Sequence, residues 1–238
     1  MHFCSEKIEK ENMRNNKLVL SFKHIAEIYL YEYYFGNEYE ISNEDKTVNY
    51  MQRAKEYIDE GNFDKALEQC INANIENPVD VFIIDRLIYC LKMIGDKESV
   101  LKYTKDSHKF RATRLELANY YRHLGWYYLE NYNPDLSIAL YKYSKMYYES
   151  KDADREINFL EEALKKDYSK ITTEQVKTKL IENNIPLDAD SVTLALLLKA
   201  SEEATSLGMI DQAKDCLYMI YDLTNDSEIA NRINNLPS

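Results

Sequence analysis

The 238-residue chain has few residues that interrupt helices: five glycines and four prolines. Because sheet proteins with many tight turns need both residue types in quantity, this scarcity argues against a turn-rich β architecture. The balance of 45% hydrophobic and 30% charged residues is that of a globular protein and not of a disordered one. Together with many Leu, Glu, Lys and Ala residues, it predicts long helices packed around a core.

A long apolar run is also missing. The most apolar stretch, Lys17 to Phe35, is interrupted by Lys23, His24, Glu27 and Glu32, so it is too polar to cross a bilayer. The first ten residues are charged and lack the apolar segment of a secretory signal. We therefore expect a cytoplasmic protein.

Basic residues are outnumbered: 30 Lys and Arg stand against 41 Asp and Glu, a formal net charge of −11. No run of five or more Lys or Arg residues occurs. A chain this acidic is repelled by phosphate backbones and by anionic lipid surfaces. These counts argue against nucleic acid and membranes as partners.

Motifs for chemistry are absent as well. The four cysteines (Cys4, Cys70, Cys90 and Cys216) form no CxxC or Cys/His spacing, and we expect free thiols that pack as small hydrophobic side chains. The four histidines are scattered, and no HExxH, GxGxxG or GxxxxGK[ST] motif occurs. The sequence therefore predicts no enzyme activity, no cofactor and no metal site.

What the chain does contain is an internal repeat. A small or compact residue is followed by another twelve positions later and by a third seven positions beyond that, and this spacing occurs four times. Small side chains let two antiparallel helices pack closely where they cross. The four sets are Ala54–Ala66–Ala73, Ile88–Val100–Ser107, Gly125–Ser137–Ser144 and Ser201–Ala213–Ile220.

The turn between the two helices recurs too. Gly61, Gly95 and Gly208 each lie seven residues after the first small residue of their set, and an acidic residue follows three positions later. Glycine ends one helix in the left-handed conformation, and the acidic side chain suits the start of the next helix. In the third set the turn is 131–135, with Pro134 just inside the next helix.

On these residues the chain resembles the tetratricopeptide repeat (TPR) family, whose unit is a helix pair of 34 residues. The best match is Thr47 to Asp80, which carries Ala54, Tyr57, Gly61, Phe63, Ala66, Ala73, Asn77 and Pro78. Weaker units are Val81 to Arg114, a third from near Ala118, and a fourth from about Leu194 to Ser227. The resemblance implies an all-α, right-handed superhelix of antiparallel helix pairs.

The pattern breaks between 151 and 190, which predicts an irregular middle. Helices are expected over Asp154 to Lys166 and Thr172 to Asn183, and a capping helix over Asp226 to Leu236. We predict three parts: 1–46 with an N-terminal cap helix within Lys17 to Phe35, repeats over 47–168, and a C-terminal helical subdomain over 169–238 with one further TPR-like pair and the capping helix.

Tyrosine is the most abundant aromatic residue, with 21 copies concentrated in Tyr29 to Tyr39 and Tyr120 to Tyr148. Two interpretations stay open: the rings pack the helix junctions, or they line a recognition groove. Adjacent pairs such as Tyr120 and Tyr121 diverge around a helix, so both members of a pair are not expected in one junction.

In proteins of the TPR family the first helix of each pair lines a concave surface that holds a peptide. The inward positions here include Met51, Asp85 and Lys92. Met51 and Asp85 stand where a carboxylate clamp for chaperone tails needs basic or amide groups, which argues against that role. The candidate groove residues are Lys55, Arg86, Tyr89, Asn119, Arg122, His123 and Trp126.

The leading functional hypothesis is an intracellular adaptor or scaffold that binds a peptide or protein segment in this groove. An alternative is a regulatory receptor for a small signalling peptide, which would normally need an output domain. A third is an enzyme whose site is assembled between repeats. Because exposed repeat ends can stack, we expect a monomer or a weak homodimer.

Overall fold

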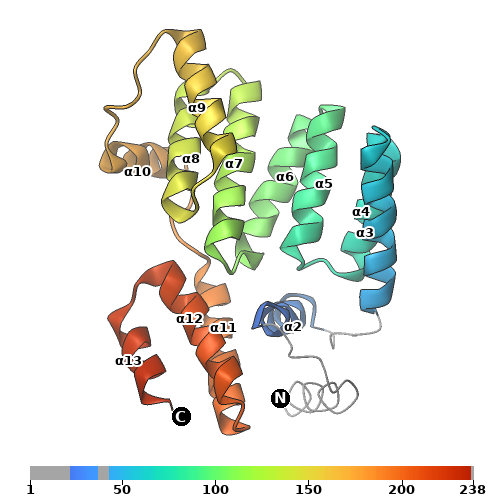
Figure 1. Ribbon diagram of the computed structural model, residues 1–238, viewed down its shortest axis with the longest axis vertical. Helices are drawn as coiled ribbons and strands as arrows, with labels where there is room; N and C mark the ends of the chain where they lie inside the picture. The colour runs from blue at the N-terminus through green and yellow to red at the C-terminus, as the bar shows by residue number, and fades with distance from the viewer. Residues whose placement is uncertain (1–21, 37–42, 237–238) are drawn as a thin grey trace. The chain divides into compact units, whose positions relative to one another are not determined.

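The computed structural model describes residues 22–36 and 43–236 (Figure 1). His2, Cys4 and the beginning of the predicted cap helix at Lys17 lie outside the described residues. The described chain is all-helical, with twelve α-helices, one 3-10 helix and no strand. The helices are α2 (Phe22–Phe35), α3 (Asn43–Asp59), α4 (Phe63–Glu76), α5 (Val81–Ile94), α6 (Lys97–Ser107), η1 (His108–Phe110), α7 (Arg114–Glu130), α8 (Pro134–Tyr147), α9 (Lys151–Leu164), α10 (Thr173–Glu182), α11 (Ser191–Ser206), α12 (Ile210–Thr224) and α13 (Ser227–Asn235).

Contacts between Cα atoms divide the chain into two compact units. The central unit is Ser42–Ala189 and contains α3 to α10; the terminal unit combines Met1–Ile41 with Asp190–Ser238 and contains α2 and α11 to α13. These boundaries differ from the sequence-based ones at 46/47 and 168/169. The sequence-based boundaries follow the start and the break of the repeat pattern, whereas the units are defined by contacts that include distant segments.

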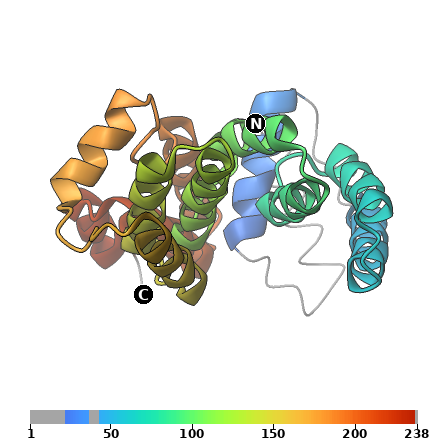
Figure 2. The ribbon, with the colours of Figure 1, turned by 90° about the horizontal axis from the view of Figure 1, so that it is seen from above.

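In the central unit each helix packs on its neighbours in the chain, from α3 against α4 to α8 against α9. Figure 2, in which α3 to α8 are seen nearly end-on, shows these helices side by side. In the region where the repeat pattern breaks, α8 contacts α7, α9 and α10. The predicted helices over 154–166 and 172–183 correspond to α9 and α10.

Capping residues explain where the helices begin and end. The side chain of Asp80 accepts from the backbone N–H groups of Phe82 and Ile83, and Thr113 and Glu116 form a reciprocal capping box at the start of α7. The predicted turn glycines have positive φ angles: 75° at Gly61, 88° at Gly95 and 74° at Gly208. The turn signals in the sequence are therefore confirmed.

The small residues of the repeat lie at helix crossings. Gly125 of α7 is buried, and a Cβ atom placed on it would lie 3.1 Å from ring atoms of Tyr141 on α8. The hydroxyl of Ser137 donates to the Gly125 carbonyl at 2.8 Å. In the first pair, Ala54, Ala66 and Ala73 have no exposed surface. Close approach of the helices therefore depends on these positions.

The terminal unit is built on α2. Its Ile28 and Tyr29 share a buried cluster with Ala200 of α11 and Cys216 of α12, and the Tyr29 hydroxyl is hydrogen-bonded to Glu203. At the chain's end, α13 packs on α12 through its buried Ile229 and Ile233. The N-terminal helix thus packs with helices more than 150 residues later in the chain. Among the described residues no helix is long and apolar enough to cross a membrane.

A polar network on the α5 and α7 faces as the candidate binding site

The carboxylate of Asp85, on α5, is the centre of a polar network in the central unit. It accepts from Arg111 Nη2 at 2.7 Å, from Asn119 Nδ2 at 2.8 Å and from His123 Nε2 at 3.1 Å. Burial alone would raise the pKa of Asp85, but the charges of Arg111 and the contact with His123 hold it well below its usual range. Asp85 is therefore a fixed anion that organises donors from two other segments.

Arg111 is fully buried in the short connection between η1 and α7. Besides Asp85, it donates to the backbone carbonyl of Glu116 at 2.6 Å and to the Ser107 hydroxyl at 3.0 Å. A buried guanidinium is tolerated only where its charge and its N–H groups find partners. The partners of its two Nη groups come from α5, α6 and α7, so Arg111 holds the three helices together, whereas its buried Nε–H has no hydrogen-bond partner among the described residues.

The His123 ring connects Asp85 to Lys92. With Nε2–H donating to Asp85, the Nδ1 atom of His123 is free to accept from Lys92 Nζ, which lies 2.9 Å away. Burial and the nearby Lys92 charge lower the pKa of His123 to about 4, so the imidazole is neutral at pH 7. His123 therefore bridges the largely buried carboxylate of Asp85 and the amine of Lys92.

Lys92 is the cation at the end of this chain of contacts. Its Nζ atom lies 5.3 Å from the centre of the Trp126 ring. Burial lowers its pKa from 10.5 to about 7, and the repulsion from Arg122 and Arg111 adds to the effect, while Asp85 and Glu156 oppose it. The ammonium form is therefore only partly compensated by its surroundings.

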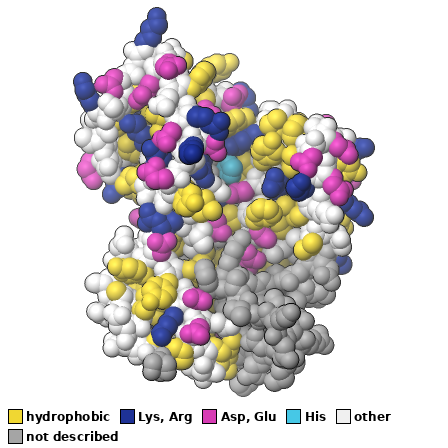
Figure 3. Space-filling view, viewed as in Figure 1, with side chains coloured by type: hydrophobic (Ala, Val, Ile, Leu, Met, Phe, Trp, Pro, Cys, Tyr) yellow, Lys and Arg dark blue, Asp and Glu magenta, His cyan; other side chains and the backbone are white. Residues whose placement is uncertain are grey.

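Arg122, one helical turn before Trp126, donates to the side-chain oxygen of Asn119. Burial also lowers the pKa of Arg122. Within the described residues, neither Arg122 nor Lys92 has a carboxylate at ion-pair distance, whereas Arg111 forms an ion pair with Asp85. Figure 3 shows basic, acidic and histidine side chains gathered over this part of the central unit. In the described part of the chain, Asp85, Asp152 and Glu156 therefore act on these two cations only from beyond ion-pair distance.

The structure brings four of the seven sequence candidates into this network: Asn119, Arg122, His123 and Trp126. The other three lie outside it. Tyr89 is 40% exposed and meets Phe63 edge-on, and Arg86 lies over the exposed Phe82 ring. Lys55 pairs with Asp59 on the exposed surface of α3.

Arg111 was not among the residues predicted from the sequence. It lies between two helices rather than on the inward face of one, and its partner Asp85 is 26 positions earlier. Asp85 and Lys92 were recognised as inward positions, but no local pattern indicated that they share His123. The capping pair Thr113 and Glu116 was a local signal for the turn that presents Arg111.

Some tyrosines of the segment 120–148 pack in helix junctions, whereas others are exposed. Tyr120 and Tyr121 are both buried, with ring centres 5.1 Å apart, so the expectation that such neighbours cannot share a junction was wrong for this pair. The rings turn edge to face, which lets both fit. Tyr143 is buried too, whereas Tyr148 is 51% exposed.

Three tyrosine hydroxyls hold a segment of the same chain. Tyr121 donates to the Pro186 carbonyl at 2.9 Å, and Tyr143 and Tyr147 both donate to the Leu187 carbonyl, at 2.9 and 2.5 Å. This part of the tyrosine cluster is therefore occupied by the connection that follows α10.

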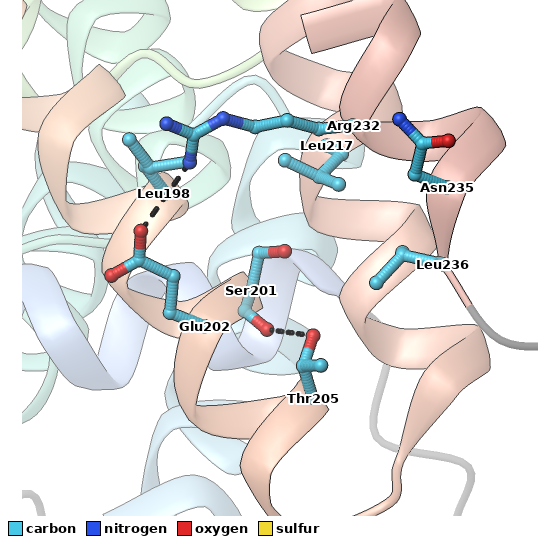
Figure 4. Close-up of a pocket in the computed structure, with 8 residues that line it drawn as sticks. All are labelled: Leu198, Ser201, Glu202, Thr205, Leu217, Arg232, Asn235 and Leu236. Atoms are coloured by element: carbon cyan, nitrogen blue, oxygen red, sulfur yellow. Dashed lines mark hydrogen bonds and ion pairs between the residues drawn. The ribbon is translucent and has the colours of Figure 1, made fainter.

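A pocket of about 260 Å³ lies among α11, α12 and α13 in the terminal unit (Figure 4). Across it Arg232 pairs with Glu202 at 3.4 Å, and the Thr205 hydroxyl donates to the Ser201 carbonyl of its own helix. Since these polar groups are used within the pocket wall, the pocket indicates no ligand class. Its lining is Leu198, Ser201, Glu202, Thr205, Leu217, Arg232, Asn235 and Leu236.

Among the described residues, no three His, Cys, Asp or Glu side chains are grouped so that they could hold a metal ion. Cys70, Cys90 and Cys216 are free thiols and buried, as the sequence predicted. The chain matches no known family model, and no curated protein is significantly similar to it.

Proposed function

We propose that this protein is an intracellular, non-catalytic interaction module that binds a peptide or protein segment along α5 and α7 of the central unit. The observation that carries the proposal is a pair of cations, Lys92 over the Trp126 ring and Arg122 one helical turn before Trp126, neither of which has a carboxylate at ion-pair distance among the described residues. The partner's contribution would be an acidic side chain.

The energetic argument starts from Lys92. Holding an amine whose pKa has fallen from 10.5 to about 7 costs the folded protein on the order of a few kcal/mol at neutral pH. A purely structural network would be more stable with an apolar residue there. A ligand carboxylate next to Lys92 and Arg122 would recover that cost on binding and would favour the ammonium form.

Aromatic and apolar side chains beside the network suit the rest of a peptide. Trp126 is half-buried, while Tyr89 and Phe82 are 40% and 55% exposed on α5. Tryptophan, tyrosine and arginine are the residues that dominate binding energy at protein interfaces. Because the whole chain carries −11, attraction of an acidic segment must come from this local group of cations and not from the general field.

The TPR-like interpretation is part of the proposal. It is supported by consecutive helices that pack in order, by left-handed glycines at 61, 95 and 208, and by small residues at the crossings. In such an arrangement α3, α5 and α7 would be the first helices of successive pairs. Free thiols at Cys70, Cys90 and Cys216 suit a reducing compartment.

Peptide selection tests the proposal, because Trp126 is the only tryptophan and reports on the site. A displayed random library would be selected on the full chain, and binding of the enriched peptides would be measured through Trp126 fluorescence. We expect enrichment of Asp and Glu next to an apolar residue, and Arg122→Ala should weaken binding at least tenfold.

Lys102→Ala serves as the matched control, because Lys102 is exposed on α6, outside the network. It should leave affinity within about twofold. Enriched peptides without acidic residues, or equal binding to the wild type and the folded Arg122→Ala variant, would overturn the assignment of the site.

A further inference from the structure

Lys92, on α5, is held by a histidine nitrogen. Its Nζ atom lies 2.9 Å from Nδ1 of His123, and no carboxylate of the described residues is at ion-pair distance from it. Lys145, on α8, is the contrasting case: its side chain is 28% exposed and pairs with Asp154 at 2.5 Å. That contact raises the pKa of Lys145 and keeps it an ammonium ion. In the described chain, Lys92 therefore lacks the kind of partner that keeps Lys145 protonated.

The His123 ring is placed to accept a proton from this amine. With Nε2–H donating to Asp85 at 3.1 Å, the lone pair of Nδ1 faces Nζ of Lys92. A proton that moves onto Nδ1 makes an imidazolium, and the Asp85 carboxylate compensates its charge. The three side chains are thus arranged as a nucleophile, a base and a group that orients the base, which is the arrangement of sites where a side chain forms a covalent bond.

Much of Lys92 is present as the neutral amine at pH 7. Burial lowers its pKa to about 7, and the charges of Arg122 and Arg111 act in the same direction, whereas Asp85 and Glu156 oppose them. About half of the amine is therefore unprotonated at neutral pH, against roughly one part in a thousand or less for a lysine with the ordinary pKa. Only the neutral amine adds to a carbonyl carbon. The residue is half-buried, so part of it is exposed to small molecules.

Arg122 and Trp126 complete the surroundings of the amine. Arg122 donates to the Asn119 side-chain oxygen, and within the described residues it has no carboxylate at ion-pair distance. A guanidinium group binds a carboxylate through two parallel hydrogen bonds. Arg122 is near enough for its charge to act on Lys92, and the centre of the Trp126 ring is 5.3 Å from Nζ. A small molecule with both a carboxylate and a carbonyl group matches the chemistry of these side chains.

We propose that Lys92 is a carbonyl-binding site, whose amine forms a reversible imine with a small aldehyde or ketone that carries a carboxylate. Arg122 binds that carboxylate, and His123 moves the protons. The inference goes beyond peptide binding, because it concerns a covalent bond to one amine. It holds whether or not a peptide binds to α5 and α7.

The chemistry balances without an oxidant or a reductant. The Nζ lone pair of Lys92 attacks the carbonyl carbon, a C–N bond forms, and one electron pair of the C=O bond moves to oxygen. His123 Nδ1 takes one proton from the nitrogen and delivers it to that oxygen, which gives a carbinolamine. The nitrogen lone pair then forms the C=N bond, the C–O bond breaks, and the oxygen leaves as water with the second proton of the amine. Because the pKa of His123 is about 4, the ring passes each proton on and does not keep it.

Reductive trapping on the full chain tests the inference. The protein would be incubated at pH 7 with glyoxylate, an aldehyde that carries a carboxylate, and with cyanoborohydride, which reduces an imine to a stable amine. Peptide mapping by mass spectrometry then gives the modified fraction of each lysine. We expect roughly tenfold more adduct on Lys92 than on Lys145 or on the exposed Lys102. The α-amino group, whose ordinary pKa is about 8, also reacts and is counted apart.

Two further measurements separate a site from general lysine reactivity. Labelling of Lys92 should reach half of its maximum near pH 7, whereas that of Lys145 should still rise at pH 10. Acetaldehyde, which has no carboxylate, should give a lower ratio of Lys92 to Lys102 labelling than glyoxylate does. Arg122→Ala should remove this difference between the two aldehydes, and His123→Gln should slow the labelling of Lys92 by glyoxylate.

Equal labelling of Lys92 and Lys102 by glyoxylate at pH 7, or labelling of Lys92 only after denaturation, would refute the proposal. If Arg122→Ala does not fold, the comparison of glyoxylate with acetaldehyde on the unchanged chain still decides, since equal ratios would exclude recognition of a carboxylate. A chain that traps glyoxylate on Lys92 but enriches no acidic peptide would contradict the proposed function alone. The reverse result would contradict only this inference.

Discussion

Arg111, in the connection before α7, and Asp85, on α5, form an ion pair, with Arg111 Nη2 2.7 Å from Asp85 Oδ1. The guanidinium has no exposed surface and the carboxylate side chain has 17%. This pair fixes the carboxylate that in turn orients Asn119 and His123. The structural part of the network is therefore Arg111 with Asp85, and the part that we propose binds a ligand is Lys92 with Arg122.

Removing the anion should destabilise the central unit strongly. Asp85→Ala leaves Arg111 buried without its counter-charge, which is expected to cost about 3–5 kcal/mol of unfolding free energy. The double variant Asp85→Leu with Arg111→Met should recover most of that loss. Urea unfolding followed by circular dichroism measures both. Asp59→Ala removes only an exposed pair with Lys55, so a loss above about 0.5 kcal/mol there would undermine the comparison.

Lys92→Met should have the opposite effect on stability. The amine pKa is lowered in the folded protein, so its charge opposes folding fully below pH 7 and no longer does so above about pH 10.5. We expect the variant to gain about 1–3 kcal/mol at pH 7, and to lose this advantage as the pH rises toward 10. The same variant should bind the selected acidic peptides less tightly. A loss of stability together with unchanged binding would show that Lys92 is only structural.

His123 predicts a dependence on pH in a different range. Its pKa is about 4 in the folded protein and about 6.5 in an unfolded chain. Between these values the unfolded chain binds a proton that the folded chain does not, so stability falls as the pH drops from 6.5 toward 4, by on the order of 3 kcal/mol.

The matched variant for this effect is His123→Gln, which can still donate to Asp85 but does not titrate. Its unfolding free energy should change less between pH 6.5 and 5 than that of the wild type. Asp85 affects the unfolding free energy at lower pH. Because its pKa is lowered in the folded protein, the stability that it adds is present above about pH 3.9 and is lost below it. Equal slopes for the two proteins between pH 5 and 6.5 would contradict the assignment to His123.

Gly125→Ala tests the helix crossing. The added methyl group would lie 3.1 Å from the Tyr141 ring, which is itself buried among Ile138, Ile157 and Leu160. Because the ring has little room to move, we expect a loss of about 1–2 kcal/mol despite the higher helix propensity of alanine. Adding Tyr141→Leu should reduce the cost of the alanine, and thermal unfolding of the four proteins measures that coupling.

Much of the local structure could be predicted because its causes lie within a few residues. Gly61, Gly95 and Gly208 adopt the left-handed conformation that their place in the turn requires, and Pro134 occupies the first turn of α8. The all-helical class was predicted from few glycines and prolines and was confirmed. Positions on one helical face, such as Asn119, Arg122 and Trp126, follow from the period of the helix alone.

The meeting of distant residues depended on tertiary structure. Asp85 contacts Arg111 and His123, which are 26 and 38 positions away, and α2 packs with α11 and α12 from the other end of the chain. No local preference encodes such contacts, because they depend on how whole helices pack and which rotamers fit between them. The tyrosine contacts to Pro186 and Leu187 belong to the same class of long-range contacts.

The sequence by itself thus determined the helices, their turns and the small residues at their crossings, since backbone preference, capping and side-chain size act over short distances. Tertiary structure decided which polar groups are paired. It paired Arg111 with Asp85, whereas Lys92 and Arg122 have no carboxylate at ion-pair distance among the described residues. Burial and packing determine which charges can reach each other.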